Sequence, residues 1–235
     1  MRCFRHCRRA AIFCLFVFIS VALVVKYPVL AATVCPSCYG VEWDGESLLI
    51  DRDMPSQQRD ALRFDIKTAV DQVSAFYGGF SVPPVVIACA SRDCDSRLGG
   101  RGARGMTYSL PFRSVVQLAP NGLNLTILTH EFSHVELHHR VGLMRQILGK
   151  LPAWFDEGLA VIVSNDERYL RPGSNAAERC LVQSSEDLPI SPFDWAPLSG
   201  KRHELYAIAA CRVLQWMDAH GGQWDLLQAE IPIGQ

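Results

Sequence analysis

The pentapeptide His-Glu-Phe-Ser-His at residues 130–134 lies inside an apolar run, residues 124–141, that predicts a helix. In a helix, residues four positions apart lie one above the other, so the imidazoles of His130 and His134 can reach one metal ion. Glu131 points to the side, where its carboxylate can hold a metal-bound water. Apolar residues surround the whole axis, which predicts a central helix whose charged groups need a cation or hydrogen bonds.

A second motif, Trp-Phe-Asp-Glu-Gly-Leu-Ala at residues 154–160, supplies Glu157, which follows the first motif after a gap of 22 residues. Catalytic zinc commonly has three protein ligands and an open position, and two histidines with one glutamate are a known set. Pro152 and the apolar run at 159–163 predict that a helix begins near this motif. Asp156 stands beside the expected ligand, where it can orient an imidazole or cap the helix.

Together the two motifs resemble the gluzincin metallopeptidases, in particular the peptidase MA-like group and, more distantly, the zinc aminopeptidases. The resemblance covers residues 121–163 strongly and 203–222 weakly. It implies a Zn²⁺-dependent peptidase in which His130, His134 and Glu157 bind the metal and Glu131 is the general base. It also implies an α+β, zincin-like fold, with a small mixed sheet packed on the active-site helix and a mainly helical C-terminal part.

Two departures narrow the expected activity. Residues 102–106, Gly-Ala-Arg-Gly-Met, lack the acidic residue that the related aminopeptidases use to hold a free amino terminus, so exopeptidase action is not supported. The metzincin pattern requires a third histidine where Arg140 stands. His138 has two interpretations, a residue that lines the substrate cleft or a polar residue favoured near a helix end, and we adopt the second. His139 points away and has no expected role.

Two further features carry hypotheses about the substrate. The peptidase MA-like group often has a tyrosine near the start of a helix such as the one predicted at 203–220. Tyr206 is therefore a candidate catalytic donor to the tetrahedral oxyanion, with His203 as a second candidate and a core tyrosine as the alternative. In zinc peptidases of this class, an edge strand before the active-site helix pairs with the substrate backbone. Residues 115–119 are placed to do so, or to form an ordinary internal strand.

The amino terminus predicts export. Residues 1–9 contain four arginines and no acid, and residues 10–25 are 16 uncharged, mostly apolar residues. We therefore predict that residues 1–31 are a signal or membrane-anchor segment, and that residues 32–235 form one exported domain. An uncleaved anchor is favoured, which places the domain on the membrane facing the periplasm or exterior. Cleavage at the small-residue site 29–31 would instead make the protein secreted.

The charge balance argues against nucleic acid as a partner. Residues 1–31 contain five of the 23 Lys and Arg residues and none of the 24 Asp and Glu residues, which leaves the exported body with a net charge of −6. An acidic body lacks the basic surface that a phosphate backbone requires. The expected partners are a peptide or protein substrate and, through the N-terminal segment, the membrane.

Six of the nine cysteines lie in the exported body, and an even number in an oxidising compartment predicts disulfides. We predict that Cys89 pairs with Cys94 and that Cys180 pairs with Cys211. Cys35 and Cys38 have two weaker interpretations, a redox-active pair or, with Cys89 and Cys94, a four-cysteine zinc knuckle.

The remaining pattern predicts alternating strands and helices ahead of the motifs. The apolar period predicts a helix with one apolar face from Ser56 to Tyr77. Gly78 and Gly79 are expected to end it. The expected strands are residues 41–51 with a turn at 44–45, 85–90, 106–110 and 114–118.

The predicted reaction is hydrolysis of a peptide bond, outside the cytoplasm and by an endopeptidase. Two other classes of protein remain as alternatives. One is a non-catalytic exported protein that binds metal and peptides, and the other is a thiol oxidoreductase that uses Cys35 and Cys38.

Overall fold

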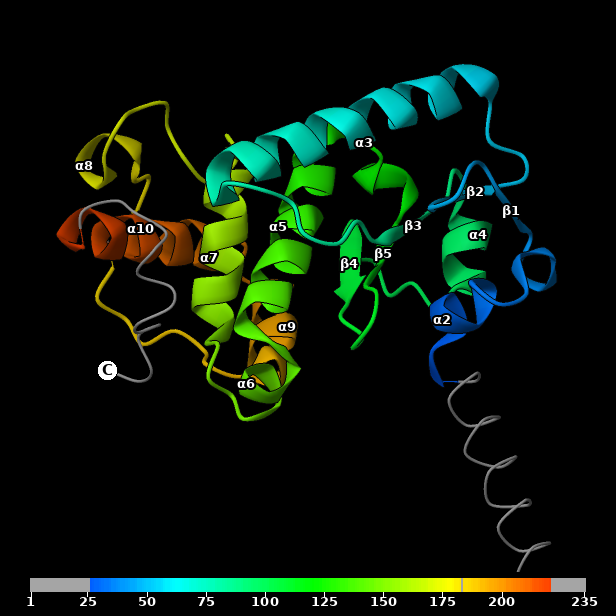
Figure 1. The fold of residues 1–235 in the computed structure, drawn as a ribbon. Coiled ribbons are helices and arrows are strands. Elements are labelled where there is room, and N and C mark those ends of the chain that lie inside the picture. The colour runs from blue at the N-terminus through cyan, green and yellow to red at the C-terminus, as the bar shows by residue number, and fades with distance from the viewer. Residues whose placement is uncertain (1–25, 183, 221–235) are drawn as a thin grey trace, which may run out of the picture.

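The computed structural model describes residues 26–182 and 184–220 (Figure 1). Most of the predicted targeting segment, residues 1–25, lies outside this part of the chain. Within the described ranges, no helix has the length and apolar character that a membrane span needs.

A five-stranded mixed sheet forms the N-terminal half, and its strands run in the order β1, β2, β3, β5, β4. The outer pairs β1–β2 and β5–β4 are antiparallel, whereas β2–β3 and β3–β5 are parallel. The strands are β1 (Val41–Trp43), β2 (Leu48–Asp51), β3 (Val85–Ala88), β4 (Gly105–Tyr108) and β5 (Val115–Leu118). The predicted strand at 41–51 is thus a hairpin with its turn where expected.

The three inner strands are buried at every position, because helices cover both faces of the sheet. Alternate residues enter two different cores. Ile50, Val86 and Leu118 pack with α3 (Ser56–Tyr77) and α5 (Leu125–Val141) on one face. Leu49 and Ile87 pack on the other face with α2 (Pro28–Ala32) and α4 (Arg92–Arg97). Figure 1 shows α3 lying along one side of the sheet. Helices α2 and α4 lie on the other side, near β1 and β2.

Both long helices before residue 142 match the sequence pattern. Helix α3 has the predicted bounds, and Gly78 ends it in the left-handed region with φ of 75°. Helix α5 begins after Asn124, whose side chain caps it by accepting from the backbone N–H of Ile127 at 3.1 Å. Eleven of its 17 residues are buried, as expected for a central helix.

The C-terminal half is mainly helical, and α7 packs on α10 with close backbone contact. Gly158 makes this possible, because a Cβ there would lie 2.6 Å from the carbonyl carbon and oxygen of Ala209. The helices of this half are α6 (Leu143–Ile147), α7 (Ala153–Val163), α8 (Ala176–Arg179), α9 (Pro192–Ser199) and α10 (Glu204–Ala219). Short 3₁₀ turns occur at η1 (Pro36–Tyr39) and η2 (Pro120–Gly122). The α+β class, the mixed sheet and the helical C-terminal part are therefore confirmed.

Of the two interpretations of residues 115–119, an edge strand and an ordinary internal strand, the internal strand is the one found. Strand β5, within residues 115–119, lies between β3 and β4 and is fully buried. Strand β4 is the edge strand on this side of the sheet, with β1 at the other edge, and all four residues of β4 are half-buried. Strand β4 comes before β5 in the sequence, but β5 pairs with β3 and leaves β4 at the edge. The lengths of the segments do not determine which of the two strands pairs with β3.

Three disulfides cross-link the described residues. Cys89–Cys94 and Cys180–Cys211 form as predicted, and the second joins the end of α8 to α10. Cys35 and Cys38 form the third. The four-cysteine zinc knuckle is therefore wrong, because sulfurs bonded in disulfides are not thiolate ligands. Three disulfides indicate an oxidising, extracytoplasmic environment.

Helix α2 belongs to the folded core although it lies within the predicted N-terminal segment. Val29 and Ala32 are 1% and 0% exposed and pack beneath β2 and β3 in the core that also holds Cys89 and Cys94. Residues 28–32 are therefore part of the folded core.

Replacing Val29 by Ala should lower the free energy of unfolding by about 2 kcal/mol, because two buried methyl groups are lost and a cavity remains. Urea unfolding followed by tryptophan fluorescence measures the change. Val34→Ala is the matched control, since Val34 is 86% exposed and should change stability little. Equal stability of the two variants would contradict the assignment of α2 to the core.

Candidate metal centre

Helices α5 and α7 bring the three predicted metal ligands together. His130 Nε2 lies 3.2 Å from His134 Nε2, and Glu157 Oε2 lies 3.4 Å from His130 Nε2 and 3.8 Å from His134 Nε2. His134 is buried, whereas the side chains of His130 and Glu157 keep 12% and 22% of their surface exposed. The trio is thus held by two packed helices and remains open to solvent on one side.

The spacing of these three atoms fits a metal ion. In a tetrahedral zinc site with bonds of about 2.0–2.1 Å, neighbouring ligand atoms lie about 3.3–3.4 Å apart. The separations here, 3.2, 3.4 and 3.8 Å, are close to that edge. The trio could therefore hold a metal ion through two imidazole nitrogens and one carboxylate oxygen.

A second group, His134, His138 and Asp156, also has ligand-type atoms close together. Here His134 Nδ1 lies 2.6 Å from Asp156 Oδ1, and His138 Nε2 lies 2.7 Å from Asp156 Oδ2. These are hydrogen-bond lengths and are too short for two ligands of one tetrahedral ion. We therefore assign this group as a hydrogen-bonded bridge, in which Asp156 orients His134 from α7. Of the two predicted roles of Asp156, orientation of an imidazole is the one found, and Pro152 occupies the N-cap of α7.

The bridge sets the charges of the metal-free site. Burial alone would lower the pKa of His134, but Asp156, with its hydrogen bond, and the charges of Glu157 and Glu131 raise that pKa to about 10. Burial likewise opposes ionisation of Asp156, yet His134 and His138 hold the pKa of Asp156 well below its ordinary value. An imidazolium and a carboxylate therefore face each other in the metal-free protein.

Glu131 lies on the same helix, with its carboxylate held by the edge strand. Its Oε2 accepts a hydrogen bond of 2.8 Å from the hydroxyl of Thr107 on β4. Gly105 makes room for it, because a Cβ there would lie 2.6–2.8 Å from Oε1, Cγ and Cδ of Glu131. Burial raises the pKa of Glu131, while His134, His130 and the Thr107 hydrogen bond oppose that rise. The carboxyl group is thus prepared to accept a proton at higher pH than an exposed glutamate.

His138 lies near the end of a helix, as the adopted interpretation expects, and it also has specific hydrogen-bond partners. It lies in the last turn of α5, but both of its ring nitrogens are engaged, Nε2 by Asp156 and Nδ1 by Ser109 Oγ at 2.6 Å. The preference of positive groups for a helix end does not explain two such contacts. His139 is exposed, in line with its lack of an expected role.

Tyr206 lies at the border of the site. The centroid of its ring is 6.4 Å from that of His130, and it stacks on Tyr169 at 5.1 Å. Burial, together with the charge of Glu157, raises the pKa of Tyr206, so its hydroxyl keeps its proton at neutral pH. His203 is the exposed N-cap residue of α10. The proposed contacts of Tyr206 and His203 with a substrate remain predictions.

Sequence analysis did not identify the residues of β4, and Ser109 just after it, as part of the site. Gly105, Thr107 and Ser109, spaced two apart, face α5, as alternate residues of a strand must. Their small and polar character, alternating with Met106 and Tyr108, is the signal that could have indicated this face.

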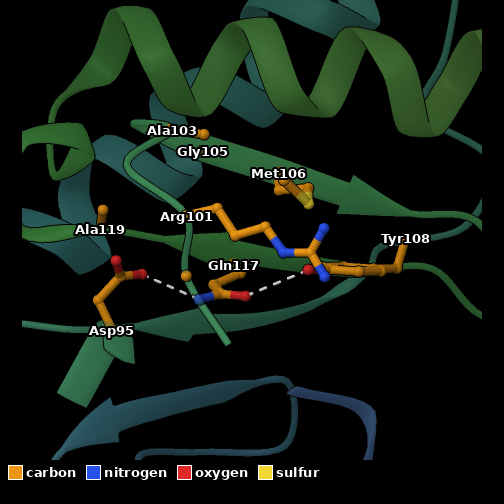
Figure 2. Close-up of a pocket in the computed structure, with 9 residues that line it drawn as sticks. Asp95, Arg101, Ala103, Gly105, Met106, Tyr108, Gln117 and Ala119 are labelled. Carbon is orange, nitrogen blue, oxygen red and sulfur yellow. Dashed lines mark hydrogen bonds between the residues drawn. The ribbon is translucent and has the colours of Figure 1, made fainter. Parts of the chain in front are cut away.

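The other face of β4 lines a separate small pocket, which Figure 2 shows with Met106 and Tyr108 beside Gln117. The Gln117 amide donates to Asp95 at 2.9 Å, and the Tyr108 hydroxyl donates to Gln117 at 3.4 Å. These polar groups pair with one another, so the pocket adds no ligands to the metal centre.

The ion pair of the metal-free site predicts a dependence of stability on pH. Because the pKa of His134 is raised from 6.5 to about 10 on folding, its contribution is complete below pH 6.5 and is lost as pH rises toward 10. The contribution of Asp156, whose pKa of 3.8 is lowered, is present above that pH and is lost as pH falls. In chelator, the unfolding free energy of the wild type should therefore fall between pH 6.5 and 10 more steeply than that of Asp156→Asn. Parallel curves in urea titrations would contradict the ion pair.

No protein-family model, no curated protein and no solved structure matches this chain.

Proposed function

We propose that this protein is a zinc-dependent endopeptidase that hydrolyses peptide bonds outside the cytoplasm. The observation that carries the proposal is the trio His130, His134 and Glu157, whose ligand atoms lie 3.2–3.8 Å apart beside the buried Glu131. The likeness of both motifs to gluzincin metallopeptidases supports it, as does an α+β fold with the motif helix against a mixed sheet.

Zinc is the metal that this ligand set favours. Two imidazoles and one carboxylate suit its borderline preference for nitrogen and oxygen, and three protein ligands leave a fourth position open. When bound, zinc supplies a lowered pKa for water and a positive charge that polarises a carbonyl group. The partial exposure of His130 and Glu157 leaves this position accessible from solvent.

Glu131 has the environment of a general base. Its buried carboxylate has a raised pKa, so it holds a proton more readily than an ordinary glutamate. It takes the proton from the attacking water and passes it to the leaving amine. Thr107 holds the carboxylate in place, because its hydroxyl donates to Oε2. Tyr206, protonated at neutral pH, is the candidate donor to the oxyanion.

The substrate is an extended peptide that pairs with β4. Among the described residues, this strand has one hydrogen-bonded neighbour, β5, so the backbone groups on its other edge can bind a peptide strand. Pairing through the main chain needs no free peptide terminus and places little constraint on the peptide sequence. Both properties fit an endopeptidase. The face of β4 that contacts Glu131 places such a peptide next to the general base.

The place of action follows from the disulfides and the amino terminus together. Three disulfides require an oxidising compartment, and the basic and apolar residues of 1–25 are typical of an export segment. We propose that this segment anchors the protein in a membrane with the metal centre on the exported side.

Glu131→Gln should lower turnover by about 10²–10⁴-fold and leave the zinc content unchanged, because the amide cannot accept the proton and Glu131 is not a ligand. The measurements are cleavage of an unfolded protein and metal analysis of the full chain. Glu157→Gln is the contrasting variant, since it should lose zinc as well as activity. A wild type and a Glu131→Gln variant that bind the unfolded protein equally well and do not cleave it would instead indicate a non-catalytic peptide-binding protein.

Gly105→Ala should lower kcat by about ten- to a hundredfold with zinc still bound, because the added methyl group displaces the Glu131 carboxylate. Gly200→Ala is the matched control, since its Cβ would meet nothing nearer than the Ala196 oxygen at 3.5 Å. Kinetics and zinc content of both variants are compared with the wild type. An unchanged kcat in Gly105→Ala would show that β4 does not set the position of the base.

A further inference from the structure

We propose that Ser109 and His138 are positioning residues of the metal centre. With Asp156 they form a hydrogen-bonded chain that ties the end of the edge strand β4 to the ligand His134. This inference rests on the proposed function in one respect, that His134 is a metal ligand.

The contacts of the chain are short and continuous. Ser109 Oγ lies 2.6 Å from His138 Nδ1, His138 Nε2 lies 2.7 Å from Asp156 Oδ2, and Asp156 Oδ1 lies 2.6 Å from His134 Nδ1. The side chains of His138 and Asp156 are each 17% exposed, so water competes little for these bonds. Three residues, one from the end of a strand and two from helices, thus act on the imidazole of His134.

The hydrogen bonds of the chain pair one donor with one acceptor at every contact. A metal ligand offers the lone pair of Nε2, so His134 must donate from Nδ1 to Asp156. The other oxygen of Asp156 accepts from Nε2 of His138, which leaves Nδ1 of His138 as an acceptor when its ring is neutral. The Ser109 hydroxyl can fill that role as the donor. Each group therefore fixes the ring orientation and the tautomer of the next.

The hydrogen-bonded chain matters for the substrate because it begins at the end of strand β4. Ser109 directly follows β4, and Thr107, two residues earlier on the same face, holds Glu131. One strand therefore positions the general base through one side chain and a metal ligand through another. A peptide paired with the outer edge of β4 would hold both in register.

The order serine, histidine, aspartate also occurs in nucleophilic hydrolases. Here the carboxylate is shared, because its second oxygen binds His134 at 2.6 Å. Asp156 thus serves the metal ligand as much as it serves His138, and the positioning role accounts for all three contacts. Reaction of Ser109 with a fluorophosphonate distinguishes the two roles.

The test measures zinc affinity of the full chain by competition with a chromophoric chelator at one pH. His138→Ala should weaken zinc binding by about 10–100-fold, as removal of an outer partner of a ligand does. Ser109→Ala should weaken it by about threefold, as expected for one neutral hydrogen bond. His138→Gln should recover part of the loss, because its amide can donate to Asp156 and accept from Ser109.

Two controls separate positioning from general destabilisation. His139→Ala alters the neighbouring, exposed histidine of α5, and Ser114→Ala alters a half-buried serine between β4 and β5. Neither should change zinc affinity. The absorption spectrum of the cobalt-substituted protein should shift in His138→Ala and Ser109→Ala and stay unchanged in the controls, because it reports ligand geometry.

Zinc affinity and cobalt spectra equal to those of the controls would overturn the proposal, and so would labelling of Ser109 by the fluorophosphonate with loss of activity. These outcomes leave the proposed function standing. A wild-type chain that binds no zinc would instead remove the proposed function itself.

Discussion

The burial of α5 is the constraint on which the rest of the structure depends. Five of its polar side chains are buried, and each of them needs a partner. Elements around the helix supply Gln72 for Thr129, Tyr77 for Ser133, Ser81 for Glu136, Thr107 for Glu131 and Asp156 for His134, and Arg140 of α5 itself also pairs with Glu136. The sheet, α3 and α7 are thus fixed around α5 by polar contacts as well as by the apolar core.

The trio of His130, His134 and Glu157 is different from these satisfied pairs. With His134 Nδ1 donating to Asp156, the Nε2 lone pairs of two neutral imidazoles would face each other and a carboxylate. Such an arrangement is repulsive unless a proton or a cation lies between the atoms. The close packing of Gly158 on α10 helps to fix α7, which carries Glu157, although the three groups do not attract one another when all are without a proton.

Sequence reasoning succeeded where the signal is local. The bounds of α3 follow from its apolar period and its glycine stop, and the ligand trio follows from the four-residue spacing in a helix and a second motif. It failed where the outcome depends on long-range pairing. The order of β4 and β5 is decided by which strand joins β3, and the role of His138 by Asp156, 18 residues away on another helix. The alternation in residues 105–109 indicates a face of β4 but not the helix that this face meets.

A proton and a metal ion compete for the same place in this centre. The negative charges around His134 raise its pKa, and the proton that it retains lets its Nε2 face His130 without repulsion. A metal ion bound by the trio would replace that proton, and its apparent affinity would be reduced by the free energy of removing the proton. Asp156 acts in both states, because it stabilises an imidazolium without metal and aligns a neutral imidazole with metal. The bridge thus preforms the site and at the same time moderates how tightly the site binds a cation.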